Sequence, residues 1–288
     1  MGRNRALAFS LSGIAALFLA CGESGDTGQV RLELGDAPFP FELIDSAIVV
    51  VESIDVHIAA DDPDQSGFHV LTTTQQTLNL LELQNGITAV LAQSEVPTGK
   101  ITEIRLEVSE ASVTLTDGRT FDLDIPSGDE SGLKVFPNPH IVVVSSLTTE
   151  LLLDFDVSRS FHPIPSGATH AAEIQEFTFR PSLRATNLSE TGTLSGTVWS
   201  DAGTAENVDD DLPLDNAAVT VYQGGEEVTA GSTDAAGHYK LLGLPGGSAL
   251  VAVTANGFGA DSLETSVVVG NESGGNDFRL TPSAARAF

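Results

Sequence analysis

The segment IRLEVSEASVTLTDGRTFDLDI, residues 104–125, decides the fold class. Apolar and polar residues alternate along it on both sides of Asp117-Gly118. A period of two places the apolar side chains on one face of a β-strand. An Asp-Gly pair between two such runs predicts a β-hairpin, because glycine accepts the positive φ that tight hairpin turns need.

The same alternation recurs through residues 30–187. It predicts a first domain that is a β-sandwich or another sheet-rich fold. Ile141–Val144 is an unbroken apolar run, which predicts a strand covered on both faces. Only Gln75–Gln93 has a spacing that suggests helix, and we expect one or two short turns there.

A second domain is expected over residues 193–282, after a polar linker at 188–192 and before a short tail at 283–288. Its apolar runs recur at intervals of roughly 10–25 residues, which predicts a small seven-stranded antiparallel sandwich. The predicted fold class is therefore all-β, with two β-sandwich-type domains in tandem.

Composition limits the function. The 288 residues include 13 Lys plus Arg and 40 Asp plus Glu, so the formal net charge is −27. This acidity argues against binding nucleic acid through phosphates and against electrostatic docking on anionic lipid. The single Cys rules out an intrachain disulfide and any cysteine-based zinc or iron–sulfur site. No glycine-rich loop between strand and helix supports nucleotide binding.

The N-terminus has the organisation of a targeting signal. Arg3 and Arg5 precede a mostly apolar run, Ala6–Ala20. A run of this length is short of the about 20 residues that span a bilayer, but it suits the core of a signal peptide. The run ends in Phe18-Leu19-Ala20-Cys21, which resembles the lipobox of bacterial lipoproteins.

That resemblance implies a signal peptide over residues 1–20 and a lipidated flexible tether over residues 21–29. It implies a diacylglycerol on Cys21, often with a third acyl chain, and two or more chains hold a protein stably on a membrane. The mature chain would carry a net charge of 11 − 40 = −29. Gly22, in place of the Asp that retains lipoproteins at the inner membrane, favours the outer membrane in a Gram-negative source.

Five motifs of the first domain occur together and in order. They are Gly35-Asp36-Ala37-Pro38, Leu78–Gly86, Val96–Lys100, Leu153–Asp156 and Phe179–Arg184. The set resembles domain-of-unknown-function family 4382, which is found in secreted lipoproteins of bacteria and archaea. The resemblance implies an extracytoplasmic location and supplies no activity.

The second domain contains Thr233–Tyr239 followed by Leu244–Gly247. This pattern resembles the carboxypeptidase regulatory-like domains, which are prealbumin-like sandwiches also classed with carbohydrate-binding-like folds. In such a turn motif Asp234 caps the turn, Gly237 supplies the unusual φ, Tyr239 points into the core and Pro245 turns the next corner.

Acidic clusters are candidate calcium sites. Val198–Asp201 resembles the repeats of Gram-positive adhesins, which carry a calcium loop just after their Trp. Calcium needs six to eight oxygen ligands. The candidate ligands are Asp201, Asp209, Asp211 and Asp215. Asp61, Asp62 and Asp64 form a second such cluster. For both clusters a solvated acidic loop without metal is the alternative.

We assign no catalytic residue. His170 and Glu173 have the His-x-x-Glu form of zinc carboxypeptidases, but the distant partner His of that family is missing. Asp154 and Asp156 share one face of a predicted strand, which could suit a glycosidase pair. The alternative is a solvent face, or an ion pair with Arg105 or Arg180.

The sequence thus predicts a non-catalytic, extracytoplasmic lipoprotein of the cell envelope with a binding, structural or adhesive role. Its expected partners are the membrane, through Cys21, and glycans or envelope proteins. Two alternatives stay open: an envelope glycan-processing enzyme that uses Asp154 and Asp156, and a calcium-stiffened adhesin. Calcium is the one cofactor considered.

Overall fold

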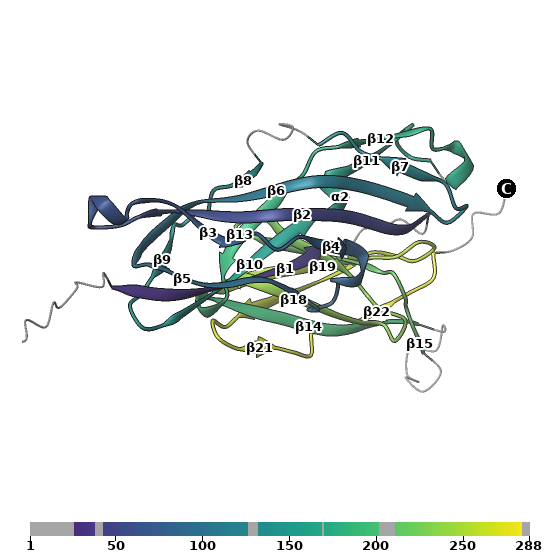
Figure 1. The fold of residues 1–288 in the computed structure, drawn as a ribbon. Helices are drawn as coiled ribbons and strands as arrows, with labels where there is room; N and C mark the ends of the chain where they lie inside the picture. Colours follow the sequence, from purple (N-terminus) through teal and green to yellow (C-terminus); the bar gives the residue numbers. More distant parts are fainter. Residues whose placement is uncertain (1–25, 38–42, 126–131, 169, 202–210, 284–288) are drawn as a thin grey trace, which may run out of the picture.

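The computed structural model in Figure 1 describes residues 26–37, 43–125, 132–168, 170–201 and 211–283. The fold is all-β, as the alternation predicts. Two separate clusters of buried apolar side chains form its cores. One cluster gathers residues between Val30 and Ala185, and the other gathers residues between Leu194 and Leu280.

The larger sheet of the first domain has seven strands within the described residues, and two long antiparallel strands form its centre. These are β2 (Ile44–Ala59) and β6 (Gly99–Leu115). Along β2 lie β3 (Gly67–Thr72) and β4 (Gln76–Asn79); along β6 lie β7 (Thr120–Asp122), β8 (Leu133–Val135) and β9 (Ile141–Val143). The predicted hairpin is confirmed, because β6 pairs with β7 around Gly118, whose φ is +86°.

The second sheet of this domain has the strand order β13-β10-β1-β5. Its strands are β1 (Thr27–Ala37), β5 (Ala89–Pro97), β10 (Thr148–Asp156) and β13 (Leu183–Asn187), and a separate ribbon pairs β11 (Phe161–Ile164) with β12 (Glu176–Phe179). β1 and β10 run parallel. The short helical elements are α2 (Val157–Ser160), η1 (Pro63–Gln65), η2 (Leu80–Glu82), η3 (Ala171–Glu173) and η4 (Leu188–Glu190). η2 confirms the short turn expected within Gln75–Gln93.

The second domain is also built from two sheets. One contains β14 (Thr191–Ser200), β15 (Leu212–Pro213), β18 (His238–Pro245), β21 (Glu272–Ser273) and β22 (Phe278–Leu280). The other contains β16 (Ala218–Gln223), β17 (Glu226–Ser232), β19 (Gly247–Thr254) and β20 (Asp261–Val267).

Two expectations about strands are wrong. The second domain is not a wholly antiparallel seven-stranded sandwich, because β21 and β22 run parallel to β14 and are too short to show an alternation. Ile141–Val144 is not covered on both faces. Val142 and Val144 are about half exposed, since β9 pairs with β6 at a margin of the sheet and only its inner face meets the core.

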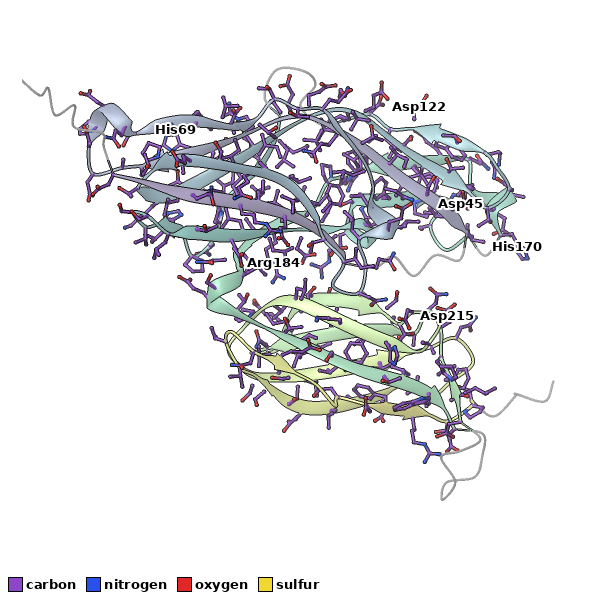
Figure 2. All side chains as sticks on the ribbon, turned by 60° about the horizontal axis from the view of Figure 1, so that its bottom comes forward. Asp45, His69, Asp122, His170, Arg184 and Asp215 are labelled. Atoms are coloured by element: carbon purple, nitrogen blue, oxygen red, sulfur yellow. The ribbon has the colours of Figure 1, made fainter. Side chains whose placement is uncertain are left out.

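The two domains lie against each other, and the chain passes between them close to Arg184 (Figure 2). The segment expected as a linker, residues 188–192, consists of the single turn η4 and the first residues of β14. Thr191 and Gly192 are already buried there. This short connection brings the outer face of the β1–β10 sheet close to β17 and β18.

Candidate functional site at the domain junction

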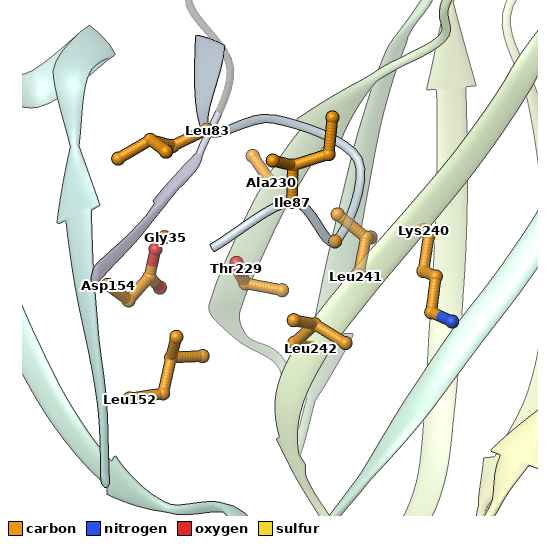
Figure 3. A pocket seen from close by; sticks show the side chains of 11 residues that line it. Gly35, Leu83, Ile87, Leu152, Asp154, Thr229, Ala230, Lys240, Leu241 and Leu242 are labelled. Carbon is orange, nitrogen blue, oxygen red and sulfur yellow. The ribbon is translucent and has the colours of Figure 1, made fainter. Parts of the chain in front are cut away.

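The domain junction is formed by the face of β10 that points away from the first core. Leu151, Leu153 and Phe155 enter that core, so the alternation turns Leu152 and Asp154 toward the second domain. Figure 3 shows Leu152 and Asp154 on one side of a gap, with residues of β17 and β18 on the other. The space between them measures about 30 Å³, which is room for a water molecule or two rather than for a ligand.

Asp154 is a buried carboxyl at this junction. Its Oδ2 lies 3.1 Å from Nη2 of Arg184, and it accepts a hydrogen bond from the Thr229 side chain of the second domain. Burial nevertheless raises the pKa of Asp154, because desolvation of the carboxylate outweighs the attraction of the arginine. The expected partners Arg105 and Arg180 are wrong: Arg184 stands opposite Asp154 in the β10–β13 register.

Asp156 also serves the structure. Its carboxylate caps α2 by accepting a hydrogen bond of 2.9 Å from the Arg159 backbone N–H. The Arg159 guanidinium then bridges the domains, at 3.4 Å from Asp156 and 2.5 Å from Glu227. Asp154 and Asp156 are therefore committed to cross-strand, capping and interdomain contacts, and the face they share meets the second domain rather than solvent.

The pKa of Asp154 leads to a prediction about pH. A raised pKa means that Asp154 holds its proton more tightly in the folded protein than in the unfolded chain. The contribution of this proton to the free energy of unfolding is therefore complete below the unfolded pKa, and it is lost as the pH rises through the folded pKa. The unfolding free energy of the wild type minus that of Asp154→Asn should therefore fall as the pH rises above about 4, the ordinary pKa of an aspartate in the unfolded chain. Urea titrations of both proteins at successive pH values measure the difference.

Asp117→Asn is the matched control. The backbone N–H of Arg119 lowers the pKa of Asp117. The unfolding free energy of the wild type minus that of Asp117→Asn should therefore rise as the pH rises through the acid range. A wild-type advantage over Asp154→Asn that grows with pH would contradict the account, because it would mean that the ion pair with Arg184 outweighs burial.

A polar groove of about 450 Å³ lies beside the junction. Asn85 of the first domain lines it, together with residues of the second domain: Ser195, Thr197, Asp234, His238, Lys240, Glu272 and Asp277. Nζ of Lys240 lies 2.8 Å from Oε2 of Glu272, and the Ser195 hydroxyl donates to Oε1 at 2.6 Å. These two bonds lower the pKa of Glu272.

Asn85 is the groove residue with an unmet hydrogen-bonding group. It has a φ of +56°, and its Oδ1 is buried without a hydrogen-bond partner among the described residues. The neighbouring Gly86 lies on the aliphatic stem of Lys240, since a Cβ at residue 86 would come within 2.9 Å of Cδ of Lys240. No local pattern in the sequence predicts this groove, because its residues come from segments that are far apart in the chain.

Asp234 and Tyr239 of the predicted turn motif line the same groove. Asp234 accepts hydrogen bonds of 2.9 Å from the backbone N–H groups of Ala236 and His238. Gly237 has a φ of +76°, and Pro245 ends β18. Tyr239 is buried and its hydroxyl donates to the Asn276 carbonyl at 2.6 Å; burial raises the pKa of this phenol.

The structure brings together only two of the candidate calcium ligands. Asp211 forms a two-pronged ion pair with Arg279, at 2.6 and 2.9 Å, and Asp201 lies 3.9 Å from the same guanidinium. Asp215 is exposed, and Asp209 lies outside the described residues. Across the described ranges, no three His, Cys, Asp or Glu side chains gather as a metal site would require. The calcium site stays a prediction.

The remaining candidates occupy short turns. Asp62 caps η1 by accepting from the Asp64 backbone N–H at 3.0 Å. In η3 the Glu173 carboxylate accepts a long hydrogen bond of 3.4 Å from the His170 backbone N–H. Cys21 lies outside the described residues. Within them, no helix has the length and apolar character needed to cross a membrane.

The geometry above defines an all-β protein with two cores joined by a buried junction. Residues 27–181 match the family model described as domain of unknown function DUF4382. The chain belongs to this family.

A comparison with solved structures finds similarity to pilins. The minor pilin GBS52 of Streptococcus agalactiae is 10% identical, with 90% of this chain and 98% of that chain covered and a TM-score of 0.27. The shaft pilin SpaA of Lactobacillus rhamnosus GG is 11% identical, with coverage of 91% and 100% and a TM-score of 0.26. No curated protein matches this chain.

Proposed function

We propose that this protein is a non-catalytic lipoprotein of the cell envelope, held outside the cytosol by acyl chains on Cys21. The observation that carries the proposal is the position of the only cysteine of the chain. It directly follows the apolar run Ala6–Ala20 and stands six positions before β1, the first strand among the described residues. Two or three acyl chains at that position would anchor the body stably.

A structural or adhesive role is supported by the contacts of Asp154 and Asp156, the two acidic side chains that the sequence places best for catalysis. A glycosidase pair needs two carboxyl groups that flank a bound sugar. Asp154 is instead paired with Arg184 beneath the second domain, and Asp156 caps α2. The proposed body is a pair of domains, residues 30–187 and 193–282, held rigidly by these contacts. The second would be a carboxypeptidase regulatory-like module.

Changing Cys21 to Ser should release the protein from the membrane. Serine provides no thiol for acylation, so the variant should leave the detergent phase on phase separation and the membrane fraction on cell fractionation. Wild type and the matched control Ser24→Ala should stay in both. Equal membrane retention of Cys21→Ser and wild type would contradict the proposed anchor.

The polar groove supports a second part of the proposal, contact with neutral glycans. Hydroxyl, amide, ammonium and carboxylate groups line it, and such a mixture can both donate to and accept from sugar hydroxyls. Asn85 lines the groove from the first domain and contributes the amide group. Three carboxylates stand against Lys240 alone, a balance that disfavours anionic sugars. Envelope proteins are the alternative partners.

Glycan binding is tested by screening the mature chain against neutral and anionic glycans. Binding of a neutral glycan should weaken at least about tenfold in both Asn85→Ala and Lys240→Ala, the loss expected when a hydrogen bond worth about 1.4 kcal/mol is removed. Lys100→Ala, remote from the groove, should bind like wild type. Undiminished binding by both groove variants, or binding of anionic glycans alone, would exclude this site.

A further inference from the structure

The described chain begins at one end of the first domain, where the turn between β9 and β10 encloses the start of β1. Figure 1 shows β9 at the same end of the molecule as the beginning of β1. The Ser146 backbone N–H donates to the Thr27 carbonyl at 3.0 Å, and the Gln29 N–H donates to the Leu147 carbonyl at 2.9 Å. The tether expected over residues 21–29 is therefore too long by three residues, because Thr27–Gln29 belong to β1. The turn lies directly beside the point where the shortened tether, residues 21–26, joins the body.

Three aliphatic side chains of β9 and this turn point outward. Val142 in β9, Val144 and Leu147 are 47%, 48% and 59% exposed, while Ile141 and Val143, which alternate with the two valines, are buried. An adjoining groove of about 590 Å³ is lined by Val142 and Val144 and by Asp26 and Lys100. Exposed aliphatic side chains that lie close together often mark a surface that a partner covers, whereas isolated ones need no such explanation.

The length of the tether limits what can cover these residues. Cys21 stands six positions before Thr27, and six residues span at most about 22 Å even when fully extended. This step rests on the proposed acylation of Cys21. With its acyl chains in the bilayer, Cys21 lies at the lipid surface. The start of β1, and the turn beside it, must therefore stay within the length of the extended tether from that surface.

We propose that Val142, Val144 and Leu147 form a membrane-contact patch that rests on the headgroup region of zwitterionic phospholipid. The charge around the patch selects this kind of lipid. Asp26 and Asp61 line the groove beside the patch together with Lys100, and the exposed Asp62 and Asp64 follow Asp61 in the chain. An anionic lipid surface would repel this end, whereas a zwitterionic surface allows the aliphatic side chains to settle among the headgroups.

Single-cysteine labelling tests the patch. The only native cysteine is blocked by lipid in the acylated protein, so a cysteine introduced elsewhere is the one free thiol. The acylated full chain carrying Val144→Cys or Leu147→Cys is labelled with a polarity-sensitive fluorophore and reconstituted into phosphatidylcholine vesicles that contain a headgroup-level quencher lipid. The matched control is Leu212→Cys, an exposed aliphatic in β15, which lies far from β9 in Figure 1.

Labels at 144 and 147 should be quenched at least twofold, and the label at 212 should not. Replacing half of the phosphatidylcholine with phosphatidylglycerol should reduce the quenching. If the protein is acylated but its label at 144 is quenched no more than the label at 212, the proposed patch is wrong and the proposed function is unaffected. If the mass of the protein shows no acyl chains, the proposed function and the patch are both wrong. Self-association through the labelled face without vesicles would assign the patch to a second copy of the chain and overturn the lipid contact.

Discussion

Replacing Phe161 with alanine should lower the free energy of unfolding by about 3–5 kcal/mol. Phe161 is 1% exposed and opens β11 beneath the first core. Its ring centroid lies 5.0 Å from that of Phe179 and 6.2 Å from that of Phe155. The substitution would remove the apolar area, leave a cavity between two fixed rings, and lose aromatic pair contacts that add to the effect of burial.

Urea unfolding followed by circular dichroism measures this loss. Phe136→Ala is the matched control: its ring is 64% exposed, so its removal should change stability by no more than about 0.5 kcal/mol. If both variants lost the same small amount, the aromatic cluster would not be part of the core.

Replacing Gly196 with alanine should destabilise the second domain by about 1–3 kcal/mol through overpacking. A Cβ at residue 196 would lie far inside van der Waals contact with the Asn276 carbonyl oxygen and 2.9 Å from the Tyr239 hydroxyl. These two groups form the hydrogen bond that anchors Tyr239, so neither can retreat without breaking it. The methyl group would therefore separate β14 from the segment before β22.

Fluorescence of Trp199 reports this change selectively, because the only tryptophan of the chain lies in β14. The control is Gly274→Ala, whose Cβ would be 3.4 Å from the Ser195 hydroxyl oxygen, an ordinary contact. We expect the Trp199 transition to shift to lower urea in Gly196→Ala and to stay in place in Gly274→Ala. Coincident transitions in both variants would refute the predicted clash.

The features that the sequence predicts correctly are local ones. The hairpin at Asp117-Gly118 is encoded by consecutive residues, and the period of two along β6 can be read without knowing its neighbours. The same holds for the turn at Asp234, where the carboxylate and the N–H groups it accepts from lie within four residues.

The features that the sequence does not predict depend on pairing between distant strands. Arg184 meets Asp154 because β13 lies beside β10 in a particular register, and Arg279 meets Asp211 from 68 residues away. The prediction that both faces of Ile141–Val144 are buried is wrong for the same reason. The run shows that these residues are apolar, but it does not show that β9 lies at a margin of the sheet. The groove at Asn85 requires the relative position of two domains.

Mass spectrometry of the N-terminal peptide of the native protein tests the central claim most directly. The account predicts a chain that begins at Cys21, with a diacylglycerol on its sulfur and no residues from the leader. An unmodified thiol at Cys21 in a chain that still carries Met1–Ala20 would contradict it.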